Sequence, residues 1–211
     1  RCDAVLSGYL GDRGNGDVVF DAVARVRAVN PDAPYACDPV MGDRSSGLFV
    51  KPDIPKVFSD QLLPIADMTF PNAFELEYLT GGTTDRLPAA LDAADTLRSR
   101  MRPGALVVLT SLMRADGPEG QIEVLAVSGD GAWLIGSPYF SGPPHGAGDC
   151  FAALFLGHYL KTRSTESALA RAVGGIHGVL AASVNSEELR IIAAQDQLDP
   201  LEPAFVPRRI R

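Results

Sequence analysis

The stretch ADMTFPNAFELEYL, residues 66–79, contains a complete transition from strand to helix. Residues 68–70 form a short apolar run that predicts a buried strand. The amphipathic residues that follow predict a helix over 73–80. A strand followed directly by a helix is the building block of a parallel sheet, so this stretch favours an α/β fold.

The same alternation extends through most of the chain. After residue 110 it changes, because two β-rich runs joined by residues 129–131 predict an antiparallel hairpin. We find no internal repeat or linker, and we therefore expect a single domain over 1–211: a mostly parallel central sheet flanked by helices, with a C-terminal hairpin and helical segment. The expected strands are 4–7, 35–38, 68–70 and 106–110, and the expected helices are 17–29, 55–63, 73–80, 87–100, 150–161, 167–184 and 187–197.

Composition narrows the function classes. A formal net charge of −7 and the absence of a basic cluster beyond the terminal PRRIR disfavour nucleic-acid binding. No apolar run approaches the roughly 20 residues of a membrane span. The three cysteines are scattered and form no CxxC pair, which favours a reducing, cytoplasmic compartment.

A glycine turn precedes the helix expected from residue 150. Gly146, Ala147 and Gly148 allow the backbone to approach a ligand closely, and the unpaired N–H groups of a helix start attract anions. Asp149, at the same place, is suited to accept a proton from a substrate hydroxyl. The alternative is that Asp149 is only the N-cap of the helix.

Three further groups of polar residues follow expected strands. Asn72 and Glu75 have the spacing of a Mg²⁺ and phosphate site, or alternatively of a capping box. Asp38 is suited to bind a metal, or alternatively forms an ordinary Asp-Pro turn. Thr110 and Ser111 offer hydroxyls for a nucleotide, although such residues are common at strand ends.

Together these groups supply what phosphoryl transfer needs. That reaction requires positioning, Mg²⁺, an anion cradle and a base, and little covalent chemistry from the protein. Because ligands of an open parallel sheet bind beyond the carboxyl ends of its strands, we expect all four groups at the same sheet edge. The chain has neither a GxxxxGK[ST] loop nor the protein-kinase motifs.

The segments SGYLGD, CDPVMGD, ADMTFPNAFELEYL and GAGDCFAALFLGHYL, in this order and spacing, resemble pyridoxal kinases of the ribokinase-like superfamily. The resemblance runs from Asp3 to about Pro203. It implies ATP-dependent phosphorylation of the 5'-hydroxyl of pyridoxal. Hydroxymethylpyrimidine (phosphate) kinases share DPVM and the PN..E spacing but tend to carry Cys in place of Asp149. A truncated, noncatalytic binder is the alternative from another class.

The resemblance also implies roles for individual residues. Asp149 would be the catalytic base and bind substrate, and 146–148 would form the anion hole. Tyr9 would lie near the pyridine ring. Phe70 stands where relatives carry Thr or Ala, so we expect only its backbone to contact a nucleotide or a monovalent ion. The residues implied at the metal are Asp38, Asn72 and Glu75, and those implied at ATP are Asp38, Phe70, Glu75, Thr110, Ser111, Ser137 and Phe140.

The resemblance further implies Mg²⁺ as cofactor, ATP as phosphate donor, K⁺ as an optional second ion, and a homodimer of the full-length protein. Pyridoxal kinases carry an additional N-terminal portion that covers the pyridine ring. We therefore expect this 211-residue chain to be poorly active by itself.

Overall fold

The computed structural model describes residues 2–142, 144–200 and 202–211. By their internal contacts these residues form two compact units, each described here by itself. The first unit runs to Asp116 and also contains Val127–Asp130. The second contains Gly117–Ala126 and Gly131–Arg211. The expectation of one domain stays a prediction.

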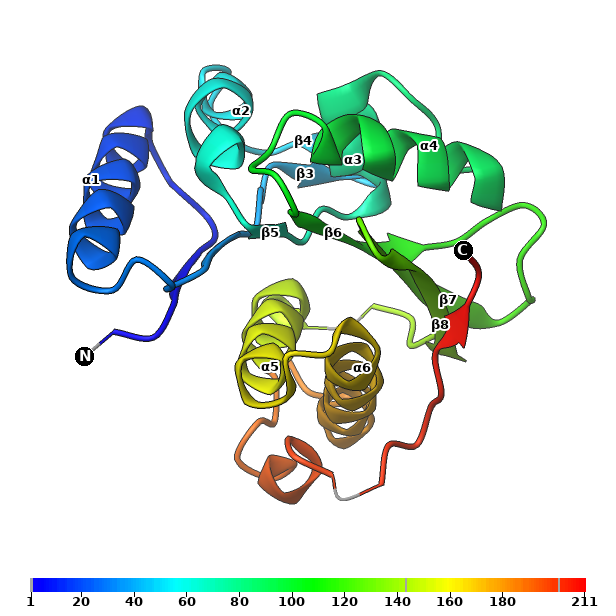
Figure 1. The fold of residues 1–211 in the computed structure, drawn as a ribbon. Coiled ribbons are helices and arrows are strands. Elements are labelled where there is room, and N and C mark those ends of the chain that lie inside the picture. The colour runs from blue at the N-terminus through cyan, green and yellow to red at the C-terminus, as the bar shows by residue number, and fades with distance from the viewer. Residues whose placement is uncertain (1, 143, 201) are drawn as a thin grey trace. The chain divides into compact units, whose positions relative to one another are not determined.

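Parallel strands form the framework of the first unit, in the spatial order β1, β2, β5, β6. Helices α2, α3 and α4 lie on one side of β5 and β6 (Figure 1), and α1 packs on β1 and α2. A small antiparallel hairpin, β3 with β4, follows β2. The bounds are β1 Val5–Ser7, α1 Arg13–Val29, β2 Tyr35–Cys37, β3 Gly42–Asp43, β4 Gly47–Leu48, α2 Ile54–Val57, β5 Met68–Thr69, α3 Ala73–Thr80, α4 Leu87–Arg98 and β6 Leu106–Leu112.

The second unit consists of strands and two packed helices. Strand β7 begins in this unit, its last residues belong to the first, and a turn at residues 129–130 joins it to β8. Helices α5 and α6 lie side by side, and the chain returns from them to pair β9 with β8 (Figure 1). The bounds are β7 Gln121–Ser128, β8 Gly131–Pro138, α5 Ala147–Thr162, α6 Thr165–Ala182 and β9 Arg208–Arg209.

The mostly parallel sheet, the flanking helices and the consecutive strands β7 and β8 agree with the expected fold class. Two expected helices differ. The helix over 55–63 is divided into α2, a π-helix over Phe58–Leu62 and a 3₁₀ turn over Leu63–Ile65, because Pro64 has no N–H to donate to the helical ladder. The helix over 187–197 is wrong: only a 3₁₀ turn, Gln195–Gln197, forms there. Ile191 and Ile192 are exposed, so the segment buries too little apolar surface to stabilise a helix.

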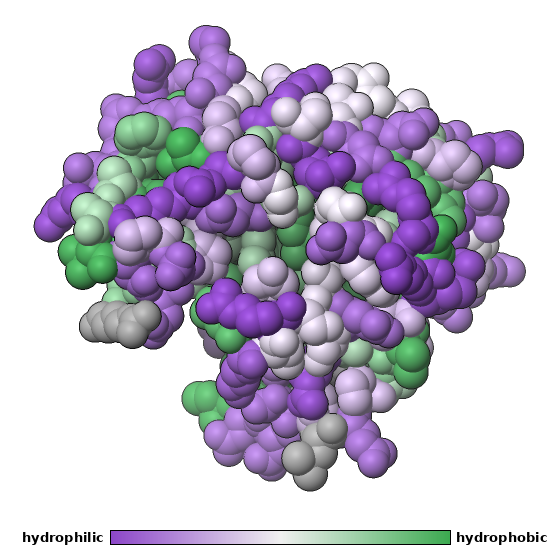
Figure 2. Space-filling model, in the orientation of Figure 1, coloured by the Kyte–Doolittle hydropathy of each residue, from purple (hydrophilic) through white to green (hydrophobic). Residues whose placement is uncertain are grey.

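Hydrophilic and hydrophobic residues are interspersed on the face shown in Figure 2. None of the helices in the described ranges is long and apolar enough to span a membrane.

Close helix packing in the first unit depends on Gly16 of α1. A Cβ at this position would lie 2.3 Å from Cγ1 of Val57 in α2. Although Ala favours helices over Gly, we expect Gly16→Ala to lower the free energy of unfolding by about 1–3 kcal/mol through overpacking. Gly157 of α5 has open space around its Cα, so Gly157→Ala should raise that energy by about 0.5–1 kcal/mol. Urea denaturation checks both variants, and stabilisation by Gly16→Ala would contradict the packing argument.

Candidate functional site

Polar residues of the first unit lie just beyond β2 and β5 and beside them near the end of β6. Asp38 directly follows β2 and is only 5% exposed, and its N–H donates to the carbonyl of Ser7 at 2.8 Å. Asn72, beyond β5, forms a parallel bridge with Thr110 of β6. The N–H of Thr110 donates to the carbonyl of Pro71 at 2.9 Å. Three of the four predicted groups therefore lie along one sheet edge.

Asn72 and Glu75 form a reciprocal cap at the start of α3. Oδ1 of Asn72 accepts from the N–H of Glu75 at 3.0 Å, and Oε2 of Glu75 accepts from the N–H of Asn72 at 2.9 Å. The capping-box interpretation is thus confirmed. The same side chains reach the preceding loop, because Oε1 of Glu75 accepts from the N–H of Met41 at 2.8 Å and Nδ2 of Asn72 donates to the carbonyl of Gly42 at 2.8 Å.

Two effects shift the pKa of the Glu75 carboxyl in opposite directions. Its side chain is 3% exposed, and burial raises its pKa to about 7 because a charged carboxylate loses its hydration there. The N–H donors of Asn72, Met41 and Gly42 oppose this shift in pKa by stabilising the charged form.

Ser111 has an unusual backbone conformation. Its φ is +52°, in the left-handed region that non-glycine residues avoid, although it lies within β6. Its side chain is exposed, next to the half-buried Thr110. Backbone strain of this kind is concentrated at ligand-binding positions, which agrees with the predicted nucleotide contact but does not test it.

In the second unit, the glycine turn and Asp149 lie at the start of α5. The N-cap is Gly146, with φ +93° and no side-chain hydrogen bond, and the N–H of Cys150 donates to its carbonyl at 2.9 Å. The suggestion that Asp149 is the N-cap is therefore wrong. Asp149 lies in the first turn with an exposed side chain, and its carboxylate has no hydrogen bond or ion pair to the described residues. The first N–H groups of α5 have no acceptor within the helix, as an anion cradle requires.

The remaining residues predicted to bind substrate or ATP differ in how exposed they are. Tyr9 follows β1 and is 61% exposed, which leaves its ring accessible. Phe70 is buried, and its N–H donates to the carbonyl of Cys37 at 3.2 Å. In the second unit, Ser137 is half-buried in β8, and the ring of Phe140 lies 5.2 Å from that of His177.

The sequence analysis did not predict the β3–β4 hairpin or the hydrogen bonds within its turn. Oδ1 of Asp43 accepts from the N–H groups of Ser45 and Ser46 and from the Ser45 hydroxyl, and these bonds lower the pKa of Asp43. The DRSSG sequence of residues 43–47 is a local signal that predicts this turn. The contacts from Glu75 to Met41 and Gly42 have no such signal, because they join residues over 30 positions apart.

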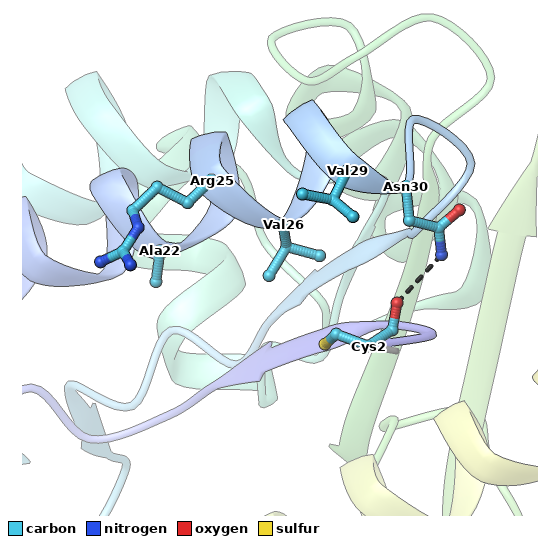
Figure 3. A pocket seen from close by; sticks show the side chains of 6 residues that line it. All are labelled: Cys2, Ala22, Arg25, Val26, Val29 and Asn30. Atoms are coloured by element: carbon cyan, nitrogen blue, oxygen red, sulfur yellow. Dashed lines mark hydrogen bonds between the residues drawn. The ribbon is translucent and has the colours of Figure 1, made fainter.

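A pocket of about 450 Å³ in the first unit contains none of the predicted site residues. It lies along the C-terminal half of α1, where Asn30 donates to the carbonyl of Cys2 at 2.9 Å (Figure 3). Its lining is Cys2, Ala22, Arg25, Val26, Val29 and Asn30.

Comparison with known proteins identifies the family. A sequence model of the family described as Phosphomethylpyrimidine kinase matches residues 1–191. The pyridoxal kinase PdxY of Leifsonia xyli is 48% identical over 209 residues, which are 98% of this chain and 73% of that relative. The chain belongs to the pyridoxal kinase family. The pyridoxal kinase PdxY of Deinococcus radiodurans is 44% identical over 216 residues, covering 100% of this chain and 72% of that relative.

Solved structures of the family have the same fold. Pyridoxal kinase from Leishmania donovani in complex with ADP and pyridoxamine has a TM-score of 0.84 at 28% identity, covering 98% of this chain and 72% of that one. A putative phosphomethylpyrimidine kinase from Bacteroides thetaiotaomicron has a TM-score of 0.86 at 25% identity, covering 99% and 73%. Membership in the ribokinase-like class expected from the sequence is therefore confirmed.

Proposed function

We propose that the protein transfers the γ-phosphoryl group of ATP to the 5'-hydroxyl of pyridoxal. The hydroxyl oxygen forms a bond to the γ-phosphorus, the bond from that phosphorus to the bridging oxygen of ADP breaks, and the hydroxyl proton moves to Asp149. The observation that carries this proposal is that Asp149, in a member of the pyridoxal kinase family, is exposed in the first turn of α5. There it lies beside N–H groups that have no acceptor within the helix.

The first unit supports the nucleotide part of the proposal. Asp38, Asn72, Glu75 and Thr110 lie along one sheet edge, where ligands of parallel sheets bind. Among the described residues no three His, Cys, Asp or Glu side chains form a metal cluster. The oxygen donors present still fit Mg²⁺, which keeps several waters and needs one or two carboxylates. Asp38 would hold it, and the bound ion would neutralise charge on the phosphates.

The proposal has features that rest on the resemblance alone: an optional K⁺ ion, and assembly as a homodimer. It also includes a cytoplasmic location, which the free thiols of Cys2, Cys37 and Cys150 support.

A substrate comparison tests the proposed function. We expect the protein to form ADP from MgATP with a higher kcat/KM for pyridoxal than for hydroxymethylpyrimidine. A higher value for the pyrimidine would overturn the substrate assignment. Saturable binding of pyridoxal without any ADP formation would show a noncatalytic binder and overturn the enzymatic assignment.

A further inference from the structure

The loop formed by residues 38–43 is fastened to the first turn of α3 by two side chains. Oε1 of Glu75 accepts from the N–H groups of Met41 at 2.8 Å and Gly42 at 3.4 Å. Nδ2 of Asn72 donates to the carbonyl of Gly42 at 2.8 Å. Met41 and Glu75 are 0% and 3% exposed, so the bonds between Glu75 and the loop N–H groups are shielded from water. We call this set of bonds the loop clamp.

The structure has no space for a side chain at Gly42. A Cβ at Gly42 would lie 2.3 Å from the carbonyl oxygen of Gly47 and 2.7 Å from the ring of Phe74. Gly47 of β4 and Phe74 of α3 therefore both pack closely against the Cα of Gly42. The N–H of Val40 donates to the carbonyl of Asp38 at 2.9 Å, which links the clamped residues to Asp38.

We propose that Glu75 is a positioning residue, which holds the 38–43 loop in its binding geometry and does not itself ligate the cation. Both of its carboxylate oxygens already accept from backbone N–H groups, Oε1 from the loop and Oε2 from Asn72. If the carboxylate turned towards a metal, it would leave buried N–H groups unpaired, which is costly. The clamp itself does not depend on the proposed function. Only the assignment of Mg²⁺ as the ion held by Asp38 rests on it.

Amide hydrogen exchange tests the clamp without metal or nucleotide. The amide group of Gln cannot accept at both of its terminal atoms, so Glu75→Gln loses either the loop bonds or the cap bond. In the presence of EDTA we expect exchange in Glu75→Gln to be at least about tenfold faster than in the wild type, either at Met41 and Gly42 or at Asn72. Asp92→Asn, which removes an exposed charge from α4, should leave these rates unchanged.

Asn72→Asp provides a second variant if Glu75→Gln does not fold. An Asp keeps the N-cap acceptor for Glu75 and removes only the donor to the carbonyl of Gly42. We expect faster exchange at Met41 and Gly42 here too, with α3 still protected. Unchanged exchange in metal-free Glu75→Gln, together with a Mg²⁺ affinity weakened about tenfold or more, would make Glu75 a metal ligand and overturn the proposal. Faster exchange in the variants, together with a wild type that forms no ADP, would retain the clamp and refute the proposed function.

Discussion

Replacing Asp149 with Asn is expected to lower kcat for pyridoxal phosphorylation by about 10²- to 10⁴-fold, because the amide cannot take the proton of the substrate hydroxyl. The fold should be retained. The side chain is exposed and makes no hydrogen bond to the described residues, so only the favourable charge at the start of α5 is lost. That loss should change the free energy of unfolding by no more than about 1 kcal/mol. Rates of ADP formation and urea denaturation check the two expectations.

A matched control separates catalysis from the loss of a helix-start charge. Glu166 lies in the first turn of α6 and is exposed, as Asp149 is in α5. Glu166→Gln therefore removes the same kind of charge and should leave kcat unchanged. Full activity in Asp149→Asn, or an equal loss in both variants, would contradict the assignment of Asp149 as the base.

The largest effect on stability is expected at Phe155 in α5. Its side chain is 0% exposed, and its ring centre lies 6.2 Å from that of Phe151 and 6.3 Å from that of Tyr159. Phe155→Ala should lower the free energy of unfolding by about 3–5 kcal/mol, because it removes buried apolar surface and leaves a cavity. For a protein with a total of about 5–15 kcal/mol this is a large fraction.

The control for this prediction is an exposed phenylalanine. Phe20 of α1 is 42% exposed, and Phe20→Ala should change the free energy of unfolding by no more than about 1 kcal/mol. Urea denaturation followed by circular dichroism measures both. Equal midpoints for the two variants would show that Phe155 does not stabilise the fold as its burial indicates.

Local signals explain where prediction from sequence succeeded. Helix α3 has the predicted bounds because its start and its end are both encoded nearby: Asn72 caps the first turn, and Gly81 adopts φ +75° just beyond the last residue. Helix α1 begins earlier than predicted, because Asp12 caps a first turn whose glycines obscure the helical pattern. The segment 187–197 forms no α-helix because its isoleucines are exposed and it has no apolar face to bury.

The sequence by itself determined the alternation of strands and helices, the cap of α3 and the glycine turn before Asp149. Each depends on a local pattern of apolar residues, glycines or capping side chains, so a short stretch contains the signal. Only the tertiary structure decided that the backbone of Met41 meets the carboxylate of Glu75 and that Thr110 lies beside Asn72. These contacts follow from the spatial order β1, β2, β5, β6, which depends on how all the apolar faces pack together and not on any single segment.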